Sequence, residues 1–118
     1  MGENIVQEKS YKFALKVIKL YKFFADKKKE NDLSKQILRS GTSIGANVEE
    51  GIGGITKNDF INIFYIAHKE ARGTNYWIRL LADSGYITQI DGKSLLSDCY
   101  ELIKLKGKII STAKKNRN

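Results

Sequence analysis

Four stretches of the chain repeat their apolar residues with the 3.6-residue period of an amphipathic helix. They cover approximately residues 7–28, 32–52, 57–84 and 92–115. No stretch alternates apolar and polar residues over a length that would favour a strand. Because the connections are short, consecutive helices are expected to lie antiparallel. The pattern therefore predicts an all-α fold, in which residues 1–118 form a single up-down-up-down four-helix bundle.

The second predicted helix keeps two glycines, Gly41 and Gly45, inside its apolar period. An interior glycine costs a helix about 0.5–1 kcal/mol relative to alanine, so both positions indicate that something comes close to the backbone. One interpretation is a small-residue seam against which a neighbouring helix packs. The alternative is a ligand or nucleic acid bound to the polar stripe on the opposite face. That stripe consists of Arg39, Ser43 and Asn47.

The first predicted helix carries apolar residues over well over half of its circumference. A bundle helix needs roughly 100° of arc for its own core. Phe13, Leu20 and Phe24 belong to this wide arc. The excess predicts contact with a second subunit as well as with the other helices of the same chain.

The third predicted helix has a second apolar patch beside its main stripe, formed by Ile66, Gly73, Trp77 and Leu80. An oligomer contact explains this patch, and closed cyclic symmetry would bury it together with the arc of the first helix. Alternatively, Trp77 could stack on exposed bases, as aromatic residues do in single-strand binders. The candidate oligomer interface comprises Phe13, Leu20, Phe24, Ile66, Trp77 and Leu80.

Lysine and arginine outnumber aspartate and glutamate by 21 to 13, which gives a formal net charge of +8. This imbalance favours polyanionic partners, with nucleic acid ahead of membrane surfaces. The first and fourth helices each carry a row of lysines, and these helices are neighbours in such a bundle. The two rows predict one basic band that suits a phosphate backbone, whereas the alternative is a solvated lysine surface. The candidate nucleic-acid-binding residues are Lys12, Lys16, Lys19, Lys104, Lys108 and Lys115.

Residues that could carry catalysis or bind a metal are few. His68 is the single histidine and lacks the Glu-x-x-His spacing of helical metal sites, so we expect it to be structural. Cys99 is the single cysteine and lies on the inward face of its helix, which predicts a core thiol and a reducing compartment. Glu49 and Glu50 are expected to form ion pairs rather than a metal-binding carboxylate pair. We therefore expect no enzyme activity, no cofactor and no metal site.

No apolar run reaches the length of a membrane span, and the N-terminus lacks the pattern of a signal peptide. These observations predict a cytoplasmic protein with no membrane partner.

Four sequence blocks together resemble a known bacterial family: RSGTSIGANVEEG at 39–51, Asp59-Phe60, KEARGTNYWIRLL at 69–81 and DSGYI at 83–87. These blocks resemble the four-helix-bundle proteins encoded in intervening sequences of 23S ribosomal RNA genes, over about residues 8–115. The family also takes in accessory proteins of diversity-generating retroelements, which work beside a reverse transcriptase. One departure is Gly73, where this branch has a glutamate.

The resemblance implies a homo-oligomer, typically a pentamer, with a basic surface as the candidate for nucleic-acid binding. Our leading hypothesis is a non-enzymatic homo-oligomer that binds RNA or DNA through phosphate contacts with little sequence specificity. The alternative is a protein–protein interaction scaffold or accessory subunit, for example beside a reverse transcriptase, in which the wide apolar faces bind the partner. The sequence leaves both hypotheses open.

Overall fold

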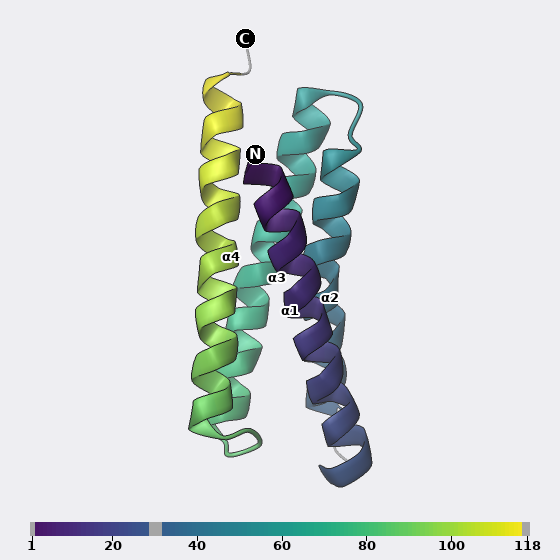
Figure 1. Cartoon of the computed structure of the whole chain (residues 1–118), viewed down its shortest axis with the longest axis vertical. Helices are drawn as coiled ribbons and strands as arrows, with labels where there is room; N and C mark the ends of the chain where they lie inside the picture. The colour runs from purple at the N-terminus through teal and green to yellow at the C-terminus, as the bar shows by residue number, and fades with distance from the viewer. Residues whose placement is uncertain (1, 29–31, 117–118) are drawn as a thin grey trace.

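The computed structural model describes residues 2–28 and 32–116, and four long helices run along these residues (Figure 1). The elements are α1 at Gly2–Phe23, a π-helical turn η1 at Phe24–Lys28, α2 at Asp32–Ile52, α3 at Lys57–Asp83 and α4 at Gln89–Lys115. They form an elongated antiparallel bundle of 51 × 21 × 19 Å, in which α1 lies between α2 and α4. The described residues contain no strand. The all-α four-helix bundle predicted from the sequence is confirmed.

The helix ends follow from local capping. Thr56 caps α3, because its hydroxyl oxygen accepts the backbone N–H of Asp59 at 3.1 Å. Thr88 caps α4 in the same way through Asp91, at 3.0 Å, so α4 begins at Gln89 rather than at residue 92. Likewise, α1 begins at Gly2, earlier than the predicted residue 7.

The connection after α3 turns at Gly85, whose φ of 85° is the left-handed conformation that favours glycine. The backbone N–H of Tyr86 then donates to the carbonyl of Leu81 at 2.9 Å, which closes the end of the helix.

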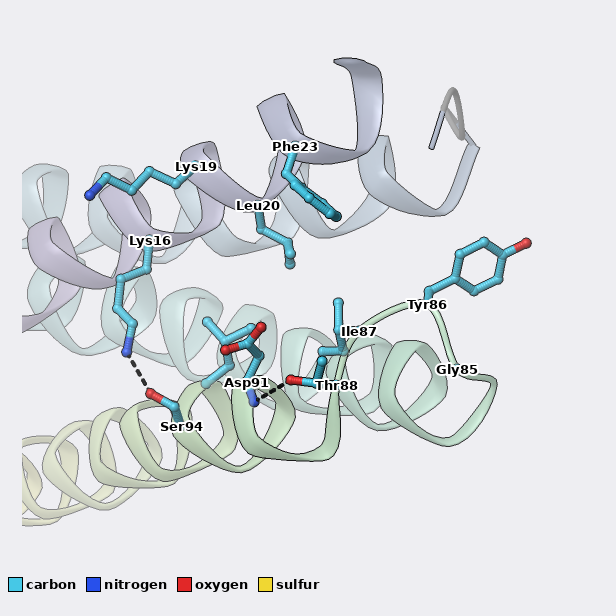
Figure 2. A pocket seen from close by; sticks show the side chains of 11 residues that line it. Lys16, Lys19, Leu20, Phe23, Gly85, Tyr86, Ile87, Thr88, Asp91 and Ser94 are labelled. Atoms are coloured by element: carbon cyan, nitrogen blue, oxygen red, sulfur yellow. Dashed lines mark hydrogen bonds between the residues drawn. The ribbon is translucent and has the colours of Figure 1, made fainter. Parts of the chain in front are cut away.

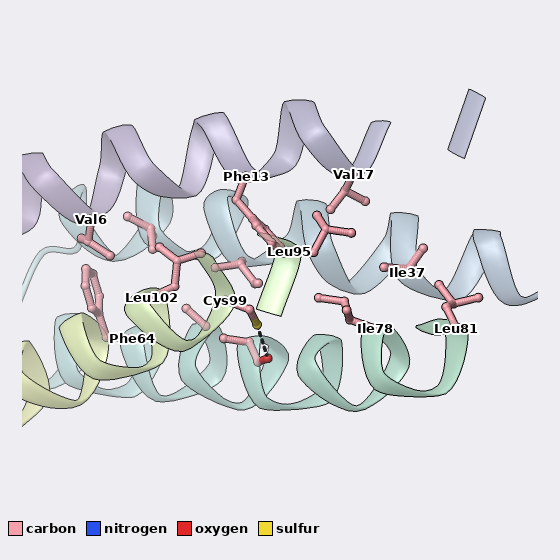
Figure 3. Packing of buried hydrophobic residues seen from close by; sticks show 14 of the residues in the cluster. Val6, Phe13, Val17, Ile37, Phe64, Ile78, Leu81, Leu95, Cys99 and Leu102 are labelled. Carbon is pink, nitrogen blue, oxygen red and sulfur yellow. Dashed lines mark hydrogen bonds between the residues drawn. The ribbon is translucent and has the colours of Figure 1, made fainter. Parts of the chain in front are cut away.

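An apolar core drawn from all four helices runs along the bundle axis (Figure 3). Phe13 is 1% exposed and Phe24 is fully buried in this core. The prediction that these two side chains face a second subunit is therefore wrong. Both are covered by the core of their own chain, so neither has exposed surface that a second subunit could contact. The wide apolar arc of α1 has a simpler cause: α1 packs against both α2 and α4, and Leu20 is a further, partly buried contributor to the same core.

The glycines of α2 lie where neighbouring helices come closest. A Cβ added at Gly41 would lie 2.9 Å from Val17 of α1, and one at Gly45 would lie 3.6 Å from the carbonyl oxygen of Ser10. At Gly51 the added Cβ would lie 2.6 Å from the ring of Phe64 on α3. The interpretation of a small-residue seam is therefore confirmed.

We expect the substitution Gly51→Ala to lower the free energy of unfolding by about 1–3 kcal/mol, because the fully buried ring of Phe64 cannot move aside. Gly45→Ala is the matched control. Its Cβ makes only ordinary contacts, so the increase in helix propensity should stabilise the protein by about 0.5–1 kcal/mol. Urea unfolding followed by circular dichroism measures both, and equal effects would contradict the close contact at Gly51.

Candidate nucleic-acid interface

The two lysine rows predicted from the sequence flank the line along which α1 packs against α4, which we call the α1–α4 seam. Lys9 of α1 forms an ion pair with Glu101 of α4 at 3.1 Å. Lys16 forms an ion pair with Asp98. It also donates to the hydroxyl of Ser94 at 3.0 Å (Figure 2). These contacts place the first and fourth helices side by side, as the bundle topology predicted.

The structure divides the six candidate lysines into two groups. Lys12 forms an ion pair with Glu8 at 2.9 Å, and this hydrogen bond raises the pKa of Lys12 and lowers the pKa of the carboxyl. Lys16 forms an ion pair with Asp98, so the charges of Lys12 and Lys16 are both balanced within the chain. The other four are exposed, and no carboxylate of the described residues forms an ion pair with them. They are Lys19, Lys104, Lys108 and Lys115.

The unbalanced charge is concentrated on the outward face of α4. Lys104 and Lys108 are one helical turn apart, and Lys115 continues the same face two turns later. We call these three residues the α4 lysine ridge. Lys104 and Lys108 are about 6 Å apart along the helix axis, because each residue of an α-helix rises about 1.5 Å. Such a ridge can contact successive phosphates of an extended strand as point charges.

The polar stripe of α2 is engaged within the bundle. Arg39 forms an ion pair with Glu70 of α3 at 3.2 Å. Asn47 donates to the carbonyl of Ser43 at 2.8 Å, and the hydroxyl of Ser43 donates one turn back along the same helix. These contacts favour the structural interpretation of the stripe over a binding site.

The α1–α4 seam is open at both ends. At one end, a pocket of about 560 Å³ lies between α1 and the α3–α4 connection, with Leu20 and Phe23 on one side and Ile87 on the other (Figure 2). At the opposite end, a pocket of about 720 Å³ is lined by residues that include Ile5 and Lys108. Most of the lining surface of both pockets is apolar, and the lining also includes lysines, Lys16 and Lys19 in the first and Lys57 and Lys108 in the second.

The remaining candidates for an oligomer interface, Ile66, Trp77 and Leu80, lie on the side of α3 next to α2. Ile66 is 48% exposed and Leu80 is 38% exposed, while Trp77 is partly buried against the core. Gly73 lies among them, and a Cβ added there would meet nothing within 4 Å. Gly73 is thus a helical glycine that no contact within the described chain explains.

Neither Cys99 nor His68 lines one of these two pockets. The thiol of Cys99 donates to the carbonyl of Ala71 at 3.1 Å, and burial raises its pKa to about 12. Burial also lowers the pKa of His68, with further lowering by the nearby charges of Arg72 and Lys106. Neither group has the character of a thiolate nucleophile or of a charged histidine.

In the described part of the chain, no three side chains of histidine, cysteine, aspartate or glutamate gather as a metal site requires. None of the described helices combines the length and the apolar character needed to cross a membrane.

Glu49 accepts a hydrogen bond from Gln7 at 2.8 Å rather than forming the ion pair that the sequence predicted.

One notable residue escaped the sequence analysis. Lys106 is fully buried, although it was passed over among the lysines of α4. The signal was present, because Lys106 stands four residues after Leu102 and four before Ile110, in the middle of the inward stripe.

Comparisons with known proteins agree with this architecture. A sequence model described as 23S rRNA-intervening sequence protein matches residues 2–108. The structure is similar to the crystal structure of a protein from Bacteroides thetaiotaomicron, described as a protein with unknown function from the S23 ribosomal protein family. The two share 47% sequence identity over 94% of this chain and 99% of that chain, with a TM-score of 0.92. The comparison with curated proteins gives no match.

We expect the Cys99 thiol to be inert in the folded protein. At pH 8 a thiol with a pKa of about 12 is ionised roughly a thousandfold less than an ordinary one, so a disulfide reagent should label the native protein that much more slowly than the urea-unfolded chain. A Ser97→Cys, Cys99→Ala variant is the control, because position 97 is exposed on the same helix and should react rapidly. Fast labelling of native Cys99 would show that the core opens.

Proposed function

Since the chain belongs to the 23S rRNA-intervening sequence protein family, we propose that it is a non-enzymatic, cytoplasmic homo-oligomer that binds RNA or DNA through phosphate contacts with low sequence specificity. The observation that carries the proposal is the α4 lysine ridge. These lysines are exposed and unbalanced, whereas the charges of Lys12 and Lys16 are compensated within the protomer. The buried free thiol of Cys99 suits a reducing compartment.

The charge distribution favours phosphates over base edges. A lysine ammonium is a compact point charge on a flexible stem, which attracts phosphate without the bidentate geometry that distinguishes bases. One ridge provides a small number of contacts, but a ring of protomers would multiply them. Each neutralised phosphate adds to a steep dependence of the affinity on salt.

The apolar patch on α3 supports assembly. We define this α3 patch by Ile66, Gly73, Trp77 and Leu80. Two of its side chains are substantially exposed, and its glycine costs the helix about 0.5–1 kcal/mol without any contact in the protomer that would need it. A neighbouring subunit that packs closely on this patch would account for both features. The resemblance to the family suggests five copies arranged around a closed ring.

A second candidate function is a protein–protein interaction scaffold, for example an accessory subunit beside a reverse transcriptase. The favouring observation is the number of exposed aromatic side chains outside the α3 patch. Tyr11 is 66% exposed, and Tyr76 and Tyr100 are each 51% exposed. Tyrosines of this kind are enriched at protein interfaces, since they combine apolar area with a hydroxyl group.

The double substitution Lys104→Glu/Lys108→Glu tests the nucleic-acid proposal. We expect the affinity for unrelated single-stranded RNA and DNA oligonucleotides to fall by roughly an order of magnitude or more at low salt. The slope of log affinity against log salt should decrease by roughly 0.7–0.9 for each phosphate that the variant no longer neutralises. Fluorescence anisotropy over a salt series measures both quantities.

The matched control is Lys35→Glu/Lys69→Glu, which reverses two exposed lysines on α2 and α3. Each reversal removes two charges, so both double variants carry a formal net charge of +4 instead of +8. If both variants bind equally weakly, net charge and not the α4 lysine ridge is responsible. If the wild-type protein binds neither nucleic acid, the proposal is wrong and the scaffold function becomes the better candidate.

The double substitution Ile66→Lys/Leu80→Lys tests assembly through the α3 patch. We expect light scattering to give several times 13.4 kDa for the wild-type protein and 13.4 kDa for the variant, because buried lysines would repel across the interface. Tyr11→Lys/Leu15→Lys is the control, since these side chains of α1 are similarly exposed but lie outside the patch. A wild-type mass of 13.4 kDa at micromolar concentration would contradict the oligomer.

A further inference from the structure

Lys106 lies in the middle of the bundle with no access to solvent. Its amine is 3.3 Å from the hydroxyl oxygen of Ser10 on α1, which is also fully buried. No carboxylate of the described residues forms an ion pair with Lys106. The lysine therefore joins α4 to α1 through a single polar contact within the apolar core.

This environment suits a neutral amine and not an ammonium ion. An ammonium group has three donors, and one hydroxyl at 3.3 Å cannot satisfy them. A buried charge without a partner costs several kcal/mol, so the group releases its proton instead. Accordingly, burial lowers the pKa of Lys106 from its usual 10.5 to about 7.

None of the surrounding elements offers a counter-charge. On the α2 side, the serine lies against Gly45, which has no side chain. On the α3 side, the charge near His68 apart from Lys106 itself is that of Arg72, which is positive and contributes to the lowered pKa of His68. From α4 itself comes the thiol of Cys99, which is un-ionised because its own pKa is about 12. Protonation of Lys106 inside the closed bundle would thus add a positive charge that nothing balances.

The position of Lys106 determines which part of the bundle would move when this side chain is protonated. Among the described residues, four polar contacts cross the α1–α4 seam: Lys9 with Glu101, Lys16 with both Asp98 and Ser94 at the surface, and Lys106 with Ser10 inside. Apart from these, α1 and α4 pack less extensively against each other than the other neighbouring helices do, and a pocket opens at each end. Separation of α1 from α4 is thus the smallest movement that would bring the amine to water.

We propose that the α1–α4 seam is a proton-operated joint, which opens when the Lys106 amine reaches solvent and takes up one proton. In the closed bundle the group is an amine, and in the opened bundle it is a hydrated ammonium, so opening consumes one proton from solution. Ser10 does not titrate in this range, and the thiol of Cys99 keeps its hydrogen bond to the carbonyl of Ala71 on α3, which separation of α1 from α4 leaves in place. This inference is independent of nucleic-acid binding and of assembly.

The sign of the pH dependence follows from the two pKa values. Between about pH 7 and pH 10.5 the opened form holds the proton and the closed form does not. Each unit decrease in pH within this window therefore favours opening by up to about tenfold. Below about pH 7 both forms are protonated, so the contribution of Lys106 no longer changes.

Hydrogen exchange followed by mass spectrometry tests the joint in the full-length protein at about pH 7, 8 and 9. After correction for the intrinsic exchange rate, protection of the inward amides of α1 and α4 should fall by up to about tenfold per unit decrease in pH, while α2 and α3 change less. In Lys106→Met, an apolar side chain of similar length, this dependence should disappear. Lys93→Met, on the exposed face of α4, should retain it.

A pH dependence that persists in Lys106→Met, or that is equal in all four helices, would overturn the proposal. A second measurement needs no variant. The carbon next to the Lys106 amine, observed by nuclear magnetic resonance, should titrate near pH 7 in the folded wild-type protein, and titration near 10.5 would also overturn it.

Discussion

The close approach of α1 to α2 is the constraint on which the rest of the bundle depends. Gly41 and Gly45 remove two side chains from the contact, and a Cβ added at Gly45 would already touch the backbone of Ser10. On its other side α1 packs less extensively, against α4. The α1–α4 seam is accordingly filled by longer groups: ion pairs at its surface, apolar pockets at its ends and the extended side chain of Lys106 inside.

The same asymmetry divides the positive charge of the molecule. Two acidic residues of α4 form ion pairs with lysines of α1, Glu101 with Lys9 and Asp98 with Lys16. The outward face of α4 keeps its lysines without such compensation. Pairing of lysines with aspartate and glutamate on one side of a helix leaves the lysines on its other side unpaired. The positions of the acidic residues therefore decide which face of the protein is strongly basic.

The extent to which the sequence predicted the structure differs between local and long-range features. The helices depend on residues a few positions apart, so their apolar periodicity was sufficient to predict them. The burial of Phe13 was missed because a helical wheel gives the width of an apolar arc but not the number of helices that share it. The compensation of Lys16 was missed because its partner, Asp98, lies 82 residues away. Lys106 was overlooked, although its position in the inward stripe of α4 was visible in the sequence.

The up-down connectivity also bears on the order in which the protein folds. Each of α1–α2, α2–α3 and α3–α4 joins helices that are adjacent in the chain, so these pairs can form with little loop-closure entropy. The α1–α4 contact joins the two ends of the chain, and during synthesis it must wait for the last helix. The chain contains no proline, so no slow prolyl isomerisation delays this step. The desolvation of the lysine amine needs both α1 and α4, so it is expected among the last events of folding.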